Sequence, residues 1–407
     1  MQKRLQALAL AHIKFVMSHD FDPLLPETFD SPHAEYRRLR AACPVAHSDA
    51  WGGFWALTKH ADVAAAAADW RNFTTAKQNV IPKVAFTGRR PPLHLDPPEH
   101  TPYRRALAPL LTERRVARLE PVIRAVSRDL LAAMVARGGG DVVADFSAHM
   151  PIATFAHWMN LPPAAVAELT AVGQRYNIAV QSNDMETTKE SSLLLYDMAR
   201  AIVADRRAMP LPVDEDATSA LLAARVDGEP LPEELIIGTI RQVLVVGIIA
   251  PSVMIGSIAV HLCRDQELQD RLRADPALVP AAVEEFLRLY TPYRGFARTP
   301  IEDVTIGGRT IPADAPVALV YASANRDADV FECPDAFRLD RPNIKESLAF
   351  GRGPHVCVGA ALARLELEVA LEELLRAGRF HAAGEPRQTR FPEIGALSAP
   401  IAFEMAA

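Results

Sequence analysis

Apolar residues recur every three or four positions along most of the chain, which is the spacing of one face of an α-helix. This pattern predicts helices at residues 31–42 and 60–69, and over most of residues 114–235 between breaks at glycine and proline clusters. Short strands are predicted at residues 54–58 and on both sides of a Gly-Gly turn in residues 304–311. We therefore expect a mainly helical fold with small β-sheets, an α+β arrangement.

The longest apolar segment lies in the middle of the chain. Residues 233–263 are predicted to form one helix, and residues 243–260 within it carry no charged side chain. These eighteen residues reach the length of a membrane span. The segment stands alone, however, and contains Gly247 and Pro251 between further helical segments. We interpret it as a buried central helix and expect no association with a membrane.

Composition narrows the class of protein. The 407 residues contain no linker, repeat or low-complexity tract, so a single domain over residues 1–407 is expected. A net charge of −6 favours neither nucleic acid nor an anionic membrane surface as partner. The four cysteines show no paired metal-ligand spacing, and the first thirty residues lack the apolar core of a signal peptide. We expect a protein of the reducing cytoplasm.

Candidate chemistry is concentrated in residues 350–359, where three glycines and a proline precede a predicted helix. Such a loop can fold tightly and pass close to a flat ligand. Cys357 lies just before the helix N-terminus, where the helix dipole and free N–H groups favour the thiolate that an iron ion needs as ligand. A lone cysteine is more often a small core residue, and the surrounding motif decides between these interpretations.

That motif, Phe-Gly-x-Gly-x-His-x-Cys-x-Gly, resembles the haem-ligand loop of the cytochrome P450 superfamily of haem-thiolate monooxygenases. The resemblance covers about residues 30–405 and implies the cytochrome P450 fold, with a long central helix over the haem and the cysteine loop beneath it. It implies haem b as cofactor, with Cys357 as the axial iron ligand. Phe350 would pack near the sulfur, backbone N–H groups as far as Gly359 would hydrogen-bond it, and His355 would reach a haem propionate.

Two further motifs match the same family. His100 and Arg104 stand in Asp-Pro-Pro-Glu-His-Thr-x-x-Arg, four residues apart and therefore on one helical face. Such a pair alone is most often a solvated surface feature, but the resemblance assigns both side chains to a haem propionate. Arg298 matches another propionate-binding arginine. An arginine suits this role because its planar guanidinium can bind a carboxylate with two hydrogen bonds.

Glu285 and Arg288 match the Glu-x-x-Arg pair of the family. Outside this context the pair would be a common surface ion pair of little weight. The resemblance implies a buried, structural pair that contacts a later arginine, for which Arg341 is the candidate. Breaking such a buried pair is costly, so we expect Glu285→Ala to lose haem.

The central helix departs from the family pattern at the oxygen site. After Gly247, Ile249 stands where the family usually has an acid, and Ala250 stands where it has a threonine. Neither side chain can deliver a proton, so ordinary hydroxylation is in doubt. Pro251 should kink the helix, and the kink either forms an oxygen-binding groove or merely bends a long helix. In the first case water, Ser252 or a polar group of the substrate would replace the missing proton donors.

The resemblance implies a monooxygenase that inserts one atom of O2 into a small to medium-sized apolar substrate, aromatic ones included, by hydroxylation or O-dealkylation. Electrons would come from a ferredoxin or flavodoxin with its NAD(P)H-dependent reductase, because the sequence carries no flavin or iron–sulfur motif. A peroxide-driven oxidase (a peroxygenase) and a haem sensor without turnover remain alternatives. The residues expected at the catalytic helix are Gly247, Ala250, Pro251 and Ser252, and those expected at the substrate pocket are Val80, Ile81, Phe86, Val243, Gly247, Tyr293, Gly295, Phe296 and Leu397.

Overall fold

The structure is a computed structural model that describes residues 20–26, 32–83, 86–390 and 392–404. Ser31, which begins the first predicted helix, lies outside the described residues. The helices are α3 (His33–Ala42), α4 (His60–Ala68), α5 (His100–Leu107), α6 (Glu113–Val116), α7 (Glu120–Ala136), α8 (Met150–Trp158), α9 (Pro163–Gln181), α10 (Met185–Ala208), α11 (Ala217–Ala223), α12 (Glu233–Arg264), α13 (Gln266–Ala274), α14 (Val279–Leu289), α15 (Tyr321–Ala324) and α16 (Ala360–Ala377).

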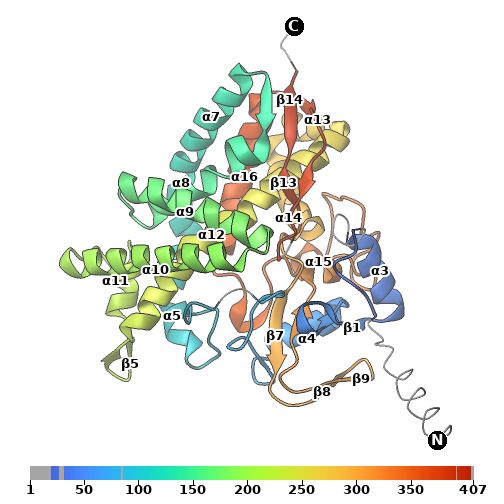
Figure 1. Cartoon of the computed structure of the whole chain (residues 1–407). Coiled ribbons are helices and arrows are strands. Elements are labelled where there is room, and N and C mark those ends of the chain that lie inside the picture. The colour runs from blue at the N-terminus through green and yellow to red at the C-terminus, as the bar shows by residue number, and fades with distance from the viewer. Residues whose placement is uncertain (1–19, 27–31, 84–85, 391, 405–407) are drawn as a thin grey trace, which may run out of the picture.

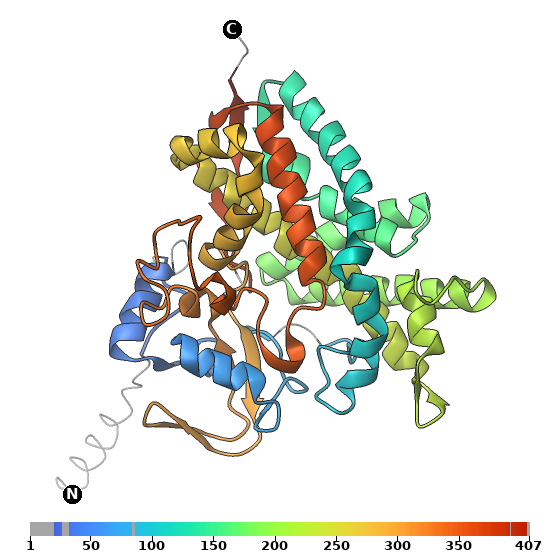
Figure 2. The same cartoon turned by 180° about the vertical axis from the view of Figure 1, so that it is seen from behind.

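The strands are short, as the sequence predicts. They are β1 (Val45–Ser48), β2 (Phe54–Leu57), β3 (Phe73–Thr74), β4 (Gly139–Asp141), β5 (Arg225–Val226), β6 (Glu229–Pro230), β7 (Phe296–Pro300), β8 (Val304–Ile306), β9 (Arg309–Ile311), β10 (Val317–Leu319), β11 (Phe380–Ala382), β12 (Arg387–Gln388), β13 (Ala396–Ser398) and β14 (Pro400–Phe403). Figures 1 and 2 show that α7 to α12 and α16 form one group of helices. The elements α3, α4 and β7 to β9 lie on the other side of the molecule. The expected mainly helical fold with small sheets is confirmed.

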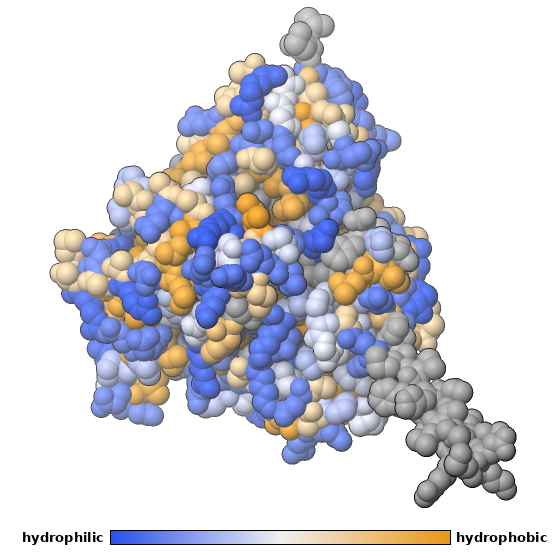
Figure 3. Space-filling view, viewed as in Figure 1, coloured by the Kyte–Doolittle hydropathy of each residue, from blue (hydrophilic) through white to orange (hydrophobic). Residues whose placement is uncertain are grey.

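Helix α12 crosses the interior and packs against α8, α10 and α16. Among the described residues it is the one helix long and apolar enough to cross a membrane, but 78% of its most apolar window is buried inside the protein. A helix that is apolar on all sides is expected in such a core position. The helix continues through Pro251 as one element. In Figure 3 the hydrophobic residues of the visible face lie in separate groups among hydrophilic ones.

The largest sheet contains Arg298, one of the residues predicted to bind a haem propionate. Its strand order is β1-β2-β10-β7-β3, with β10 parallel to β2 and antiparallel to β7. The register pairs Val317 with Arg298, which fixes Arg298 in the middle of the sheet at a buried position. A second sheet, β11-β14-β4, joins the last strand to the segment between α7 and α8.

A buried ion cluster joins α14 to the loop that precedes the cysteine segment. Both carboxylate oxygens of Glu285 accept hydrogen bonds from Arg288, at 2.6 and 2.7 Å, and from Nε of Arg341, at 3.0 Å. All three side chains are 5% exposed or less. Arg288 also donates to the carbonyl oxygens of Pro334 and Asn325 at 2.7 and 2.8 Å. The cluster therefore holds the irregular segment 325–341 against α14.

Replacing Glu285 by alanine would leave two buried guanidinium groups without a counter-ion. We expect the free energy of unfolding to fall by about 3 to 5 kcal/mol, and the implied haem to be lost. Urea unfolding and the ratio of haem to protein measure both effects. Glu332→Gln is the matched control, because the Glu332 side chain is 83% exposed and pairs with Arg338 at the surface. An equal loss of stability in both variants would contradict the assignment.

Candidate functional site

A cavity of about 350 Å³ lies between α12 and the cysteine loop. One wall comes from α12, with Val243, Gly247 and Ala250 among the residues on it. The opposite wall is the segment from Phe350 to Gly359. The loop before α5, the start of β7 and the turn at Pro392 close the remaining sides. The cavity therefore joins Cys357 to the helix that the sequence singles out.

The cysteine loop is held by its own backbone and by close packing on α4. The N–H of Cys357 donates to the carbonyl oxygen of Phe350 at 2.8 Å, which closes the loop on itself. Gly353 has φ +76°, and a Cβ atom there would lie 2.7 Å from Cα of Ala68, so glycine is required on both counts. Helix α16 then begins at Ala360. The sulfur thus occupies a fixed position at the cavity wall, just before a helix.

Burial in the protein raises the pKa of the Cys357 thiol, although the N–H of Gly359 and the charges of Arg104 and Arg364 act to lower it. The expectation that the helix N-terminus alone favours the thiolate is therefore incomplete, because desolvation outweighs it. A bound metal ion supplies the positive charge that deprotonates a coordinating thiol outright. The thiolate at this position is thus tied to metal binding.

His100, Arg104, Arg298 and His355 line the cavity near Cys357, and among the described residues only His355 has a carboxylate within 4 Å. Among the described residues no carboxylate forms an ion pair with Arg104 or Arg298. Both ring nitrogens of His100 and the Nε2 of His355 are buried without a hydrogen bond, the latter 3.7 Å from Oδ1 of Asp96. The two rings contact each other edge to face at 4.7 Å. Unpaired buried donors around one cavity fit the propionate groups of a haem.

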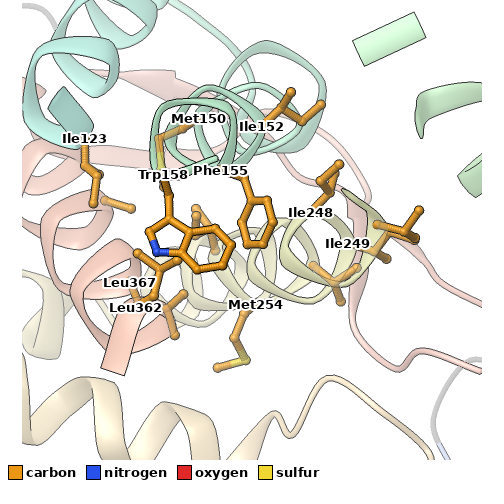
Figure 4. Close-up of a cluster of buried hydrophobic side chains, with 14 of the residues drawn as sticks. Ile123, Met150, Ile152, Phe155, Trp158, Ile248, Ile249, Met254, Leu362 and Leu367 are labelled. Carbon is orange, nitrogen blue, oxygen red and sulfur yellow. The ribbon is translucent and has the colours of Figure 1, made fainter. Parts of the chain in front are cut away.

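The α12 wall differs from expectation at two positions. A Cβ atom on Gly247 would lie 2.3 Å from the ring of Phe155. Figure 4 shows this ring pointing from α8 toward the part of α12 that carries Ile248. Gly247 therefore permits close packing of α8 on α12 as well as lining the cavity. Ser252 does not line the cavity: its Oγ lies 3.1 Å from Oγ of Ser147, on the opposite side of the helix. Because its hydroxyl contacts Ser147 outside the cavity, we no longer propose Ser252 as the replacement proton donor.

The structure brings together only part of the predicted substrate pocket. Val80, Val243, Gly247, Tyr293 and Phe296 line the cavity, as do Ala250 and Pro251 of the catalytic set. The others do not, each for a local reason. Ile81 packs in a separate core cluster, Phe86 is 61% exposed, Gly295 faces the backbone of Leu319, and Leu397 belongs to β13 outside the cavity.

Several polar residues that the sequence did not single out also line the cavity. Arg90 comes from the loop before α5, Arg241 from α12 and Glu393 from the turn before β13. Burial raises the pKa of Glu393 to about 7, and its carboxylate accepts a hydrogen bond from Gln181. Glu366 on α16 is fully enclosed, and burial raises its pKa well above the usual value. Nothing in the sequence around a single charged residue indicates that its side chain faces the interior.

Comparison with known proteins agrees with this geometry. The cytochrome P450 family model matches residues 180–405. Cytochrome P450 130 of Mycobacterium tuberculosis is 34% identical over 88% of this chain and 91% of its own length. Linalool 8-monooxygenase of Pseudomonas putida is 32% identical over 88% of this chain and 92% of its own length.

The solved structure of cytochrome P450 CYP109Q5 from Chondromyces apiculatus superposes with a TM-score of 0.85 at 30% identity, and covers 95% of this chain and 99% of that one. Fold, sequence and site geometry therefore lead to the same family. The family binds haem through a cysteine thiolate, and Cys357 is the cysteine that faces the cavity. The chain belongs to the cytochrome P450 family, the haem-thiolate oxidoreductases.

Proposed function

We propose that the protein inserts one oxygen atom from O2 into a small to medium-sized substrate with a largely apolar body, by hydroxylation or O-dealkylation. The observation that carries this proposal is the cavity that joins Cys357 to the apolar part of α12. When bound, haem supplies the oxygen activation. A volume of about 350 Å³ suits a small organic molecule.

The chain's own residues bind and orient that substrate. Val243 and Phe296 offer apolar contacts from two walls. Val80 forms an antiparallel β-bridge with Phe296, the first residue of β7. Tyr293 packs against Phe296 with ring centroids 4.8 Å apart, which limits the positions open to either ring. Apolar walls of this kind exclude water and favour the apolar part of a ligand.

Proton supply depends on atoms other than the usual side chains. Ile249 and Ala250 line the cavity but have no acidic side-chain proton to transfer, and Ser252 is hydrogen-bonded to Ser147. Pro251 has no N–H, so the carbonyl oxygen of Gly247 lacks its helical partner and can hold a water molecule by accepting a hydrogen bond from it. We propose that water at this carbonyl, or a polar group of the substrate, delivers the proton.

Electrons are proposed to come from a separate ferredoxin or flavodoxin with an NAD(P)H-dependent reductase, in the cytoplasm. The partner would dock on the cysteine side, where Arg105 and Arg114 are exposed and Arg352 is 47% exposed beside Glu346. Arg104 belongs to the cavity wall rather than to this surface. Charge reversal at Arg105 and Arg114 should slow ferredoxin-driven turnover without changing substrate affinity.

A peroxide-driven oxidase is the second candidate, favoured by the missing acid and threonine on α12. The two candidates are separated by their oxidant. The reduced protein with CO should first give the red-shifted Soret band of a thiolate ligand. NADH with redox partners and O2 should then give product in a substrate panel. Product formed with hydrogen peroxide alone would support the peroxygenase, and NADH oxidation absent with every partner and substrate would support a sensor.

Replacing Ala250 by threonine tests how protons arrive. If water or substrate already delivers them, the fraction of NADH consumption that yields product should change by less than about twofold, because the new hydroxyl adds little to an adequate route. Coupling is measured as product formed per NADH oxidised. Ala250→Val controls for added volume at the same place. A severalfold gain in the threonine variant alone would show that the native route is inadequate.

A further inference from the structure

Two arginines form part of the cavity wall far from the cysteine. Arg90 lies in the loop before α5 and Arg241 on α12, and they are 5% and 1% exposed. Both line the cavity, and in both the Nε atom is buried without a hydrogen-bond partner among the described residues. Arginine is almost never this deeply buried unless its charge is paired.

The partners that these arginines do have are all uncharged. Arg241 donates to Oγ of Ser192 at 2.7 Å and lies 5.1 Å from the ring centroid of Tyr176. A terminal nitrogen of Arg90 lies 3.3 Å from Nε2 of His94. Within the part of the chain that the structure describes, neither guanidinium forms an ion pair with a carboxylate. Three other deeply buried arginines are paired with carboxylates: Arg288 and Arg341 share Glu285, and Arg206 pairs with Asp216.

The two charges also oppose each other. Burial, and after it the charge of Arg241, lower the pKa of Arg90 to about 10. Burial and then the charges of Arg90 and Arg241 lower the pKa of His94 to about 3, so this histidine is neutral at pH 7. Two positive charges held together away from water are unfavourable unless an anion joins them.

Packing holds this arrangement in place. A Cβ atom on Gly238 of α12 would lie 2.1 Å from the carbonyl oxygen of Arg89, so the loop backbone lies directly on the helix. The hydroxyls of Thr87 and Ser192 hydrogen-bond at 2.6 Å, which ties the same loop to α10 beside Arg241. The packing of the folded protein therefore holds the two positive charges close to each other before any ligand binds.

We propose that Arg90 and Arg241 bind the anionic group of the substrate, a carboxylate or a phosphate monoester, whose apolar body extends along α12 toward Ala250. Arg241 and Ala250 are nine residues apart, which is roughly 13 Å along a helix axis at 1.5 Å per residue. The substrate is thus an amphipathic organic anion, oxidised at the end opposite its charge. This inference rests on the proposed function, since it names the substrate class of the same cavity.

Ligands with one apolar body and different head groups test the proposal on the haem-loaded protein: para-butylbenzoate, its methyl ester and para-butylphenyl phosphate. Binding is followed by the Soret spin shift and by calorimetry. At least one of the two anions should bind with a Kd about tenfold lower than that of the ester, because a hydrogen bond to a charged group contributes about this much to affinity. The tighter anion identifies the head group. Equal affinity of the ester and both anions in the wild-type protein would overturn the proposal without any variant.

Substitutions then locate the effect. Arg241→Gln and Arg90→Gln should each weaken binding of the preferred anion about tenfold, and leave the ester unchanged. Arg241→Lys should retain part of the preference. Arg200→Gln on α10 is the control, because Arg200 is 51% exposed and pairs with Asp197 at the surface. Unchanged anion affinity in both glutamine variants would overturn the proposal.

The failure of this proposal and of the proposed function can be told apart. Coupled NADH-driven oxidation of neutral substrates without any preference for anions would refute the anion site alone. A preference for anions that depends on Arg241, in a protein that oxidises nothing with NADH and redox partners, would refute the monooxygenase function and leave the anion site standing.

Discussion

The position of the cysteine loop depends on the ion pairs that the carboxylate of Glu285 forms with Arg288 and Arg341. This carboxylate binds Arg288 and Arg341 in the protein interior, and Arg288 passes this constraint on by donating to the carbonyl oxygen of Asn325 at 2.8 Å. The side-chain oxygen of Asn325 then accepts the N–H of Leu348 at 2.7 Å, two residues before the cysteine loop begins. One buried negative charge thereby fixes a helix, an irregular segment and the start of the loop that presents Cys357.

Pairing of charges divides the interior into two kinds of region. At Glu285, each of the two buried arginines has the carboxylate and several carbonyl oxygens as partners. Around the cavity, five basic groups have no carboxylate partner among the described residues: His100, Arg104 and Arg298 near the cysteine, and Arg90 and Arg241 at the other end. Unsatisfied groups of this kind are costly, so their grouping around one cavity indicates ligands rather than packing.

The sequence predicts those parts of the site that depend on residues close together along the chain. The cysteine loop and the Glu-x-x-Arg pair are set by glycine geometry and helical spacing, and the structure places Cys357, Glu285 and Arg288 accordingly. Which side of a helix or strand faces the cavity depends on distant partners.

Ser252 turns to Ser147 on another segment, and Gly295 faces the backbone of β10, so neither contact is visible in the local sequence. The same holds for Arg90 and Arg241: long-range contacts, such as that of Gly238 with the backbone of residue 89, bring them to one cavity.

The sheet β11-β14-β4 has a consequence for how the protein is made. Strand β14 pairs with β4, so that Ile401 lies opposite Gly140, and β4 leads directly into the segment that supports α12 through Ser147 and Ser252. During synthesis the ribosome delivers β4 long before residues 400–403 emerge. The edge of β4 that pairs with β14 therefore stays unpaired until residues 400–403 have been made, so this sheet is completed only at the end of synthesis.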